Sequence, residues 1–187
     1  MTGVQRPSST PAPWHRATLC ALALGLAAPI AAAQSASPES LKAEVVYRVL
    51  MFVTWPPERE TPGRGLQICT LGDGRVDSAL QTLSGRPIRQ LTVDVRRLSR
   101  AEPAAGCHLL YLAAPQPALR TMLADAPVLV VSDGAAMLDH GAMINLQVED
   151  GRIVFDVELD AARRAGLVIS TKLLRLARFV RHQAATP

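Results

Sequence analysis

Two cysteines are the residues of this chain with the most definite chemistry. Of its three cysteines, Cys69 and Cys107 lie well inside the chain. In an oxidising compartment such a pair is typical of a disulfide, and closing a loop of this size would stabilise the fold by roughly 4 kcal/mol. The alternatives are two buried free thiols and a metal site, although neither cysteine lies in a Cys-x-x-Cys or His-x-x-x-His pattern.

A second group of chemically capable side chains lies between two predicted strands. Asp133, Asp139, His140 and Asn145 are close in sequence, at the expected end of one strand and the start of the next. Sheet ends of this kind are where α/β proteins bind ligands. Because Asp and Asn are also common turn residues, a purely structural role is the alternative. We treat Asp133, His140 and Asn145 as candidate contacts for a ligand or a partner.

Enzyme signatures are missing from the sequence. It contains no Gly-x-Ser-x-Gly nucleophile elbow, no phosphate-binding loop and no full dinucleotide-binding pattern. We therefore expect a non-catalytic protein without a cofactor or a metal. An enzyme built around the four polar residues above is kept as a competing hypothesis.

The first 33 residues have the pattern of a secretory signal peptide. They contain no acidic residue, two arginines and a short apolar run from Ala17 to Pro29, followed by Ala31-Ala32-Ala33. The apolar run is too short to span a bilayer. We expect cleavage after Ala33, which would remove Cys20, leave a short leader at residues 34–38 and place the mature chain in the periplasm.

Removal of this segment nearly balances the charge. The full chain carries 20 basic and 16 acidic residues, a formal net charge of +4, and both basic residues of the segment are lost with it. A nucleic-acid-binding protein usually has a larger basic excess. We therefore expect no nucleic-acid partner.

Alternating strand and helix patterns follow the leader. Ser37-Pro38-Glu39 is typical of a helix start, and apolar residues at helical spacing (Leu41, Val45, Val49, Phe52) continue until Trp55-Pro56-Pro57. Asp150-Gly151 is a strong hairpin turn signal, and Asp160 is expected to cap a short helix that ends near Gly166. The further expected strands are Leu66–Leu71, Leu91–Leu98, Cys107–Leu112, Val128–Ser132, Met143–Val148 and Arg152–Glu158, with helices at Asp77–Leu83 and Pro117–Ala124.

These elements predict one α/β domain. Its sheet would be mixed but mostly parallel, with helices on both faces and a C-terminal hairpin followed by a helix. In such a sheet Cys69 and Cys107 would lie near each other, on neighbouring strands or on a strand and the segment leading into another.

The last predicted helix is basic along one side. It is expected from Thr171 to Arg181, with Ser170 as its cap, and its cations recur every third residue: Lys172, Arg175, Arg178 and Arg181. A solvated face explains such a pattern. The functional alternative is a docking face for an acidic partner or anionic headgroups. Lys172 and Arg175 are accordingly candidate partner contacts.

A series of segments follows in a characteristic order along the chain: Leu41-Lys42-Ala43, Phe52-Val53-Thr54-Trp55-Pro56, Ile68-Cys69-Thr70-Leu71-Gly72-Asp73, Leu83-Ser84-Gly85-Arg86, Cys107 to Leu112, Pro127 to Asp133, Gly141 to Leu146, Val154 to Leu167 and Ile169 to Ala177. In these segments and their order the chain resembles the YfiR family of periplasmic repressors of membrane-bound diguanylate cyclases. The resemblance covers residues 39–181, within an expected domain at 39–183.

The resemblance implies a homodimer that binds the periplasmic region of an inner-membrane cyclase and keeps it inactive, so that release raises cyclic di-GMP and favours biofilm formation. In the family, redox state acting through disulfides is one proposed release signal. Cys69 and Cys107 match one family pair, whereas a second pair near the late hairpin has no counterpart here. A single-disulfide switch and a purely structural bond both stay open. The competing function is a small-ligand sensor for another membrane receptor, such as a histidine kinase.

Overall fold

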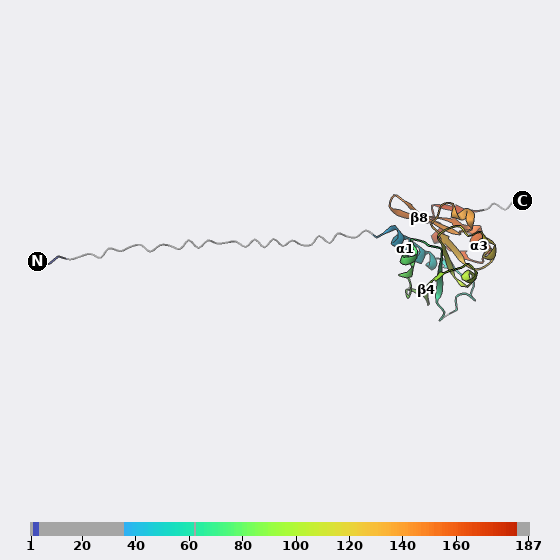
Figure 1. The fold of residues 1–187 in the computed structure, drawn as a ribbon, viewed down its shortest axis with the longest axis horizontal. Helices are drawn as coiled ribbons and strands as arrows, with labels where there is room; N and C mark the ends of the chain where they lie inside the picture. The colour runs from blue at the N-terminus through green and yellow to red at the C-terminus, as the bar shows by residue number, and fades with distance from the viewer. Residues whose placement is uncertain (1, 4–35, 62, 183–187) are drawn as a thin grey trace. The chain divides into compact units, whose positions relative to one another are not determined.

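A computed structural model describes residues 2–3, 36–61 and 63–182 of the chain. The predicted signal peptide lies outside these residues, apart from two positions near its start. Among the helices of the described residues, none has the length and apolar character needed to cross a membrane. The elements are α1 (Pro38–Met51), β1 (Val53–Thr54), β2 (Leu66–Leu71), α2 (Asp77–Gln81), β3 (Pro87–Ile88), β4 (Leu91–Leu98), η1 (Glu102–Gly106), β5 (Leu109–Leu112), α3 (Pro117–Met122), β6 (Leu129–Ser132), η2 (Met137–His140), β7 (Ile144–Glu149), β8 (Arg152–Glu158), α4 (Leu159–Arg164), β9 (Val168–Ile169), α5 (Thr171–Leu174) and β10 (Phe179–Arg181) (Figure 1).

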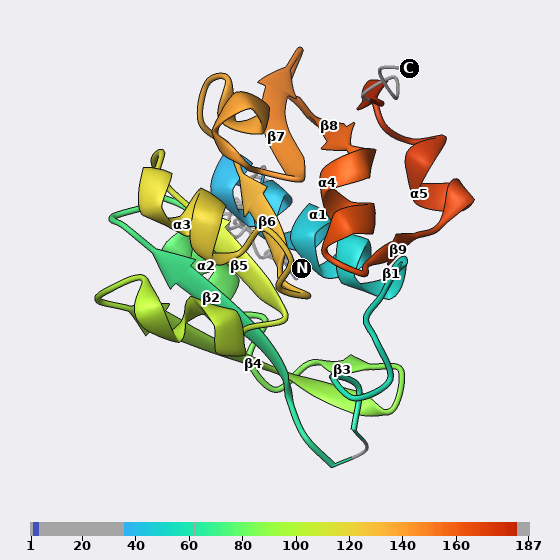
Figure 2. The ribbon, with the colours of Figure 1, turned by 90° about the vertical axis from the view of Figure 1, so that its right-hand side faces the viewer.

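One eight-stranded sheet forms the centre of the domain. Its strand order is β10-β8-β7-β6-β5-β2-β4-β3. Only the hairpins β7/β8 and β3/β4 pair antiparallel, and the other neighbours in the sheet are parallel. Figure 2 follows this order from β3 and β4 at one edge to β8, the neighbour of the other edge strand β10. The predicted mixed, mostly parallel sheet is confirmed.

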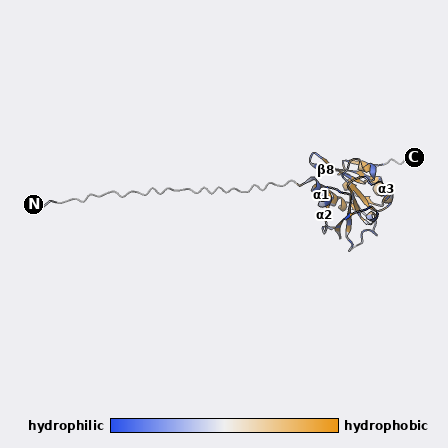
Figure 3. Ribbon diagram, in the orientation of Figure 1, coloured by the Kyte–Doolittle hydropathy of each residue, from blue (hydrophilic) through white to orange (hydrophobic). Residues whose placement is uncertain are grey.

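Both faces of the sheet are covered, because its inner strands alternate between two apolar clusters. Leu109 and Tyr111 of β5 pack under α1, α2 and α4, whereas Leu110 and Leu112 pack against η1, α3 and η2. The apolar colouring in Figure 3 follows these buried strands. The near-continuous apolar runs seen in the sequence are therefore explained by strands buried on both sides.

Helix α1 begins as its sequence predicts. The Ser37 hydroxyl accepts a hydrogen bond from the Ser40 backbone N–H at 3.2 Å, and Pro38 occupies the first turn. Of the apolar residues expected on its buried side, Val49 is buried and Val45 and Phe52 are partly buried, but Leu41 is exposed. The hairpin turn also follows its sequence: Asp150 and Gly151 both have positive φ, at 48° and 73°.

The end of the domain differs from the predicted helix. Ser170 does cap a helix, but α5 ends at Leu174, and Phe179–Arg181 instead form an edge strand parallel to β8. The Arg178 backbone N–H donates to the Phe155 carbonyl, and the guanidinium groups of Arg178 and Arg181 pair with acidic side chains of β8. Strand pairing and these ion pairs outweigh helix propensity, so the expected four-cation helix face does not exist.

Several smaller boundaries also differ: α2 ends at Gln81 and α3 at Met122, each slightly earlier than predicted. Helix α4 begins at Leu159, so Asp160 lies in its first turn and is not its cap. Strand β5 begins at Leu109, so Cys107 and His108 form the segment leading into it.

Candidate binding site

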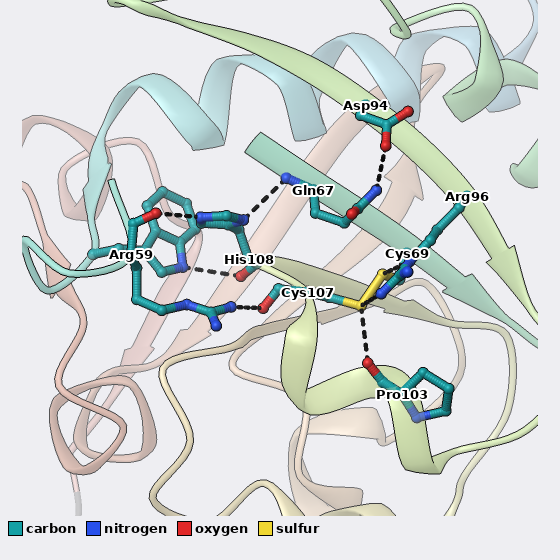
Figure 4. The surroundings of a disulfide bond; sticks show 9 residues. Arg59, Gln67, Cys69, Asp94, Arg96, Pro103, Cys107 and His108 are labelled. Carbon is teal, nitrogen blue, oxygen red and sulfur yellow. Dashed lines mark hydrogen bonds between the residues drawn. A yellow bond between two sulfur atoms is a disulfide. The ribbon is translucent and has the colours of Figure 1, made fainter. Parts of the chain in front are cut away.

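The two cysteines are joined at the centre of the domain. Cys69 lies on β2 and Cys107 lies just before β5, the strand next to β2, with Cα atoms 6.0 Å apart. Both are fully buried. Arg96 of β4 places its Nε 3.5 Å from the Cys69 sulfur and its Nη2 3.9 Å from the Cys107 sulfur (Figure 4). The predicted disulfide is therefore present, on a strand and the lead-in to its neighbour.

A polar network holds the backbone beside this disulfide. The His108 Nδ1 accepts from the Gln67 N–H at 3.0 Å, and its Nε2 lies 2.8 Å from the Arg59 carbonyl (Figure 4). The Arg59 guanidinium in turn donates to the Cys107 carbonyl, and Trp55 donates to the His108 carbonyl. An imidazole with one acceptor and one donor nitrogen is neutral. Burial lowers the pKa of His108 in agreement with this state.

The four polar candidate residues, three of them between β6 and β7 and Asn145 within β7, divide into two pairs. Asp133 turns toward α1 and accepts from the Lys42 ammonium at 2.6 Å, while Asn145 donates from Nδ2 to the Gly134 carbonyl at 3.0 Å. Asp139 and His140, in contrast, line a cavity that neither Asp133 nor Asn145 reaches. The four residues are close in sequence, but the fold separates Asp133 and Asn145 from Asp139 and His140, the two of the four that line the cavity.

The cavity lies between α3, η2 and α4. Its volume is about 340 Å³, and its walls also take in Leu112 and Val130 of the sheet and the end of β10. Arg181 crosses one side and pairs with Asp139, at 2.7 Å, and with Glu158. The hydrogen bond from Arg181 holds the pKa of Asp139 below its ordinary value. Sequence reasoning missed Glu158 and Arg181, because one was assigned only to a strand and the other to a helix.

The candidate partner residues near the C-terminus are exposed. Lys172 and Arg175 lie on α5 and just after it, and among the described residues no ion pair involves either of them. Three large apolar side chains of the same segment are also exposed: Val168 at 64%, Leu176 at 68% and Phe179 at 56%. Arg178, in contrast, is held by Asp156 and Glu149.

Comparison with known protein families shows to which family the chain belongs. A model of the YfiR/HmsC-like family matches residues 39–178. The chain belongs to the YfiR/HmsC-like family. The match begins in the first turn of α1 and ends just before β10. It covers the disulfide, the residues between β6 and β7, and α5, and the expected family is confirmed; Phe179 and Arg181 lie just beyond the match.

Two solved structures have a distant likeness to this YfiR/HmsC-like chain. One is a domain from Streptococcus pneumonia in complex with L-Trp, at a TM-score of 0.47 and 10% identity, covering 77% of this chain and 60% of that one. Another is a conserved domain protein from Vibrio cholerae, at a TM-score of 0.46 and 10% identity, covering 78% of this chain and 60% of that one. The chain thus spans about 60% of the length of these proteins.

No grouping of metal ligands is found in the part of the chain that the structure describes: no three His, Cys, Asp or Glu side chains there are grouped as metal ligands. YfiR-like proteins are regulatory, and the features that stand out in this member are a cross-linked core, a cavity and an exposed C-terminal segment.

Proposed function

We propose that this chain is a periplasmic regulatory protein that represses an inner-membrane diguanylate cyclase by binding the cyclase's periplasmic region. The family match over residues 39–178 carries this proposal. The Cys69–Cys107 disulfide supports it, because disulfides persist in oxidising compartments such as the periplasm. Repression then requires that the chain bind the inactive conformation of the cyclase more tightly than the active one.

The C-terminal segment is the surface that we assign to the partner. We define it as Val168, Lys172, Arg175, Leu176 and Phe179. It combines exposed apolar side chains with cations that make no ion pair among the described residues. Protein interfaces commonly have apolar anchors within a polar, charged rim. The surface therefore fits a partner region that is apolar at its centre and acidic around it.

Deletion of the gene tests the function. Loss of the repressor is expected to raise cellular cyclic di-GMP and biofilm, and the wild-type gene is expected to restore both. Unchanged cyclic di-GMP in a strain that normally exports the protein would contradict the proposal.

Charge reversal tests the assigned surface. The double variant Lys172→Glu/Arg175→Glu is expected to bind the cyclase about tenfold more weakly, because both charges become repulsive toward an acidic rim. It should therefore complement the deletion poorly. Arg75→Glu is the matched control, since Arg75 is exposed on the loop between β2 and α2. Equal complementation by both variants would place the interface elsewhere.

A second candidate function is a small-ligand sensor for another membrane receptor, and the 340 Å³ cavity favours it. Affinity capture of the membrane protein that binds the chain, followed by its identification, separates the two candidate functions. A receptor without a cyclase domain would support this one.

A further inference from the structure

The cavity between α3, η2 and α4 has the dimensions of a small-molecule site. Its volume of about 340 Å³ is at the lower end of the range for ligand pockets, which begins at about 300 Å³. Apolar side chains from β5, β6, α3 with its C-cap residue, and the segment just before β7 line it: Leu112, Leu119, Leu123, Val130, Ala142 and Met143. An apolar body of modest size would fit against these residues.

Positive charge is in excess around the cavity. Arg120, Arg164 and Arg181 line it, against two carboxylates. Arg181 is paired with both of these, Asp139 and Glu158. Arg120 donates only to the Asp139 backbone carbonyl, and Arg164 has no ion pair among the described residues. Two guanidinium groups therefore stay available for an anion, which arginine binds through paired hydrogen bonds.

Glu158 adds a buried hydrogen-bond acceptor to the cavity wall. Its side chain is 5% exposed, and only one of its carboxylate oxygens, Oε2, accepts from Arg181. The other, Oε1, is buried without a hydrogen-bond partner among the described residues. Buried polar atoms are normally paired, so an unpaired acceptor in a cavity wall calls for an explanation. A donor on a bound ligand would pair with it.

The charge balance selects the type of donor. An ammonium group would add a cation to a lining that already carries more cations than anions. A hydroxyl group donates to Glu158 without adding charge. Ala161 and Arg164, one turn apart on α4, both line the cavity, so an anion held at Arg164 would lie on the α4 side.

We propose that this cavity binds a small amphipathic hydroxy acid. Its carboxylate is held by Arg120 and Arg164, its hydroxyl donates to Glu158, and its alkyl chain lies on the apolar lining. This site goes beyond the proposed repression of a cyclase and does not depend on it. Binding to the purified chain can fail while repression holds, and repression can fail while binding holds.

Two matched probes test the hydroxyl. Calorimetric titration of the purified, disulfide-bonded chain would compare β-hydroxyoctanoate with octanoate, which differ only in that group. The hydroxy acid is expected to bind about tenfold more tightly, because octanoate leaves the Glu158 oxygen unpaired. Equal affinities, or no binding of either acid at millimolar concentration, would overturn the proposal.

Neighbouring arginines test the anion contact. Arg164→Glu is expected to weaken binding of β-hydroxyoctanoate at least about tenfold, through loss of one contact and repulsion of the carboxylate. Arg163→Glu is the control, because Arg163 is next in sequence and exposed but does not line the cavity. The same loss in both variants would overturn the assignment.

A bulky side chain at the rim of the cavity tests the location of the binding site without changing a charged residue. Ala124 is exposed and lines the cavity, so Ala124→Trp should leave folding intact and abolish binding. Circular dichroism and the melting temperature would confirm that the variant is folded. Undiminished binding to the folded variant would contradict this site.

Discussion

The disulfide region and the C-terminal segment both contain basic and large apolar side chains, but only the first region uses them for contacts inside the domain. Around Cys69 and Cys107, an arginine, a histidine and a tryptophan make hydrogen bonds with backbone groups inside the domain, and both cysteines are buried. Along Val168 to Phe179, cations and apolar side chains are left facing solvent. Changes in the first region should therefore act on stability, and changes in the second on partner binding.

The largest expected effect comes from the disulfide. Cys69→Ala/Cys107→Ala should lower the free energy of unfolding by roughly 4 kcal/mol, because the loop of 38 residues is no longer closed in the unfolded chain. Urea titration measures this loss. Reductant should destabilise the wild type but leave the double variant unchanged. A wild type indifferent to reductant, with its bond shown to be broken, would contradict the role of the disulfide.

Trp55 gives the next largest effect. Its side chain is 2% exposed and its indole N–H donates to the His108 carbonyl at 3.0 Å. Trp55→Phe should cost about 2 kcal/mol, since it removes that bond and part of a buried ring. Urea titration would measure this loss in the free energy of unfolding. A loss below about 0.5 kcal/mol, which is typical of exposed positions, would contradict the contrast between the two regions.

His108 adds a pH dependence to the same region. Its pKa is lowered in the folded chain from an ordinary value of 6.5, so between these two values the unfolded chain binds more protons. Stability is therefore complete above about pH 6.5 and falls as the pH is lowered toward the folded-state pKa. His108→Gln should lose that slope. Measurement of the free energy of unfolding between about pH 7.5 and about pH 5 would show the slope. If His108→Gln kept the same slope, another titrating group would be its source.

The smallest effect on stability is expected in the C-terminal segment. Phe179→Ala should change the free energy of unfolding by no more than about 0.5 kcal/mol, because its side chain is 56% exposed. Partner binding should fall far more. A variant that loses stability and binding equally would show that Phe179 packs within the domain.

The sequence predicted the elements whose signals are local. Ser37-Pro38 at the start of α1, Asp150-Gly151 in the hairpin and the apolar runs of the inner strands depend on neighbouring residues, and the structure confirms them. Arg178 and Arg181 misled the prediction, because spacing at every third residue fits a helix. Their partners, Asp156 and Glu158, are more than twenty residues away.

The site shows the same division. The cysteine pairing followed from composition and compartment, but the cavity depends on contacts between α3, η2, α4 and β10 that no short motif encodes. Asp139 and His140 were placed on the right loop. Glu158 gave only a weak signal: it ends a run in which Phe155 and Val157 point to one face of β8 while Asp156 and Glu158 point to the other.

Capture of the partner tests the central claim most directly. The affinity-tagged full chain would be recovered from detergent-solubilised membranes, and its bound proteins identified. We predict an inner-membrane diguanylate cyclase, retained by the wild type and lost when its periplasmic region is removed. Retention of a cyclase that lacks that region, or recovery of no cyclase from a strain that expresses both proteins, would contradict repression by periplasmic binding.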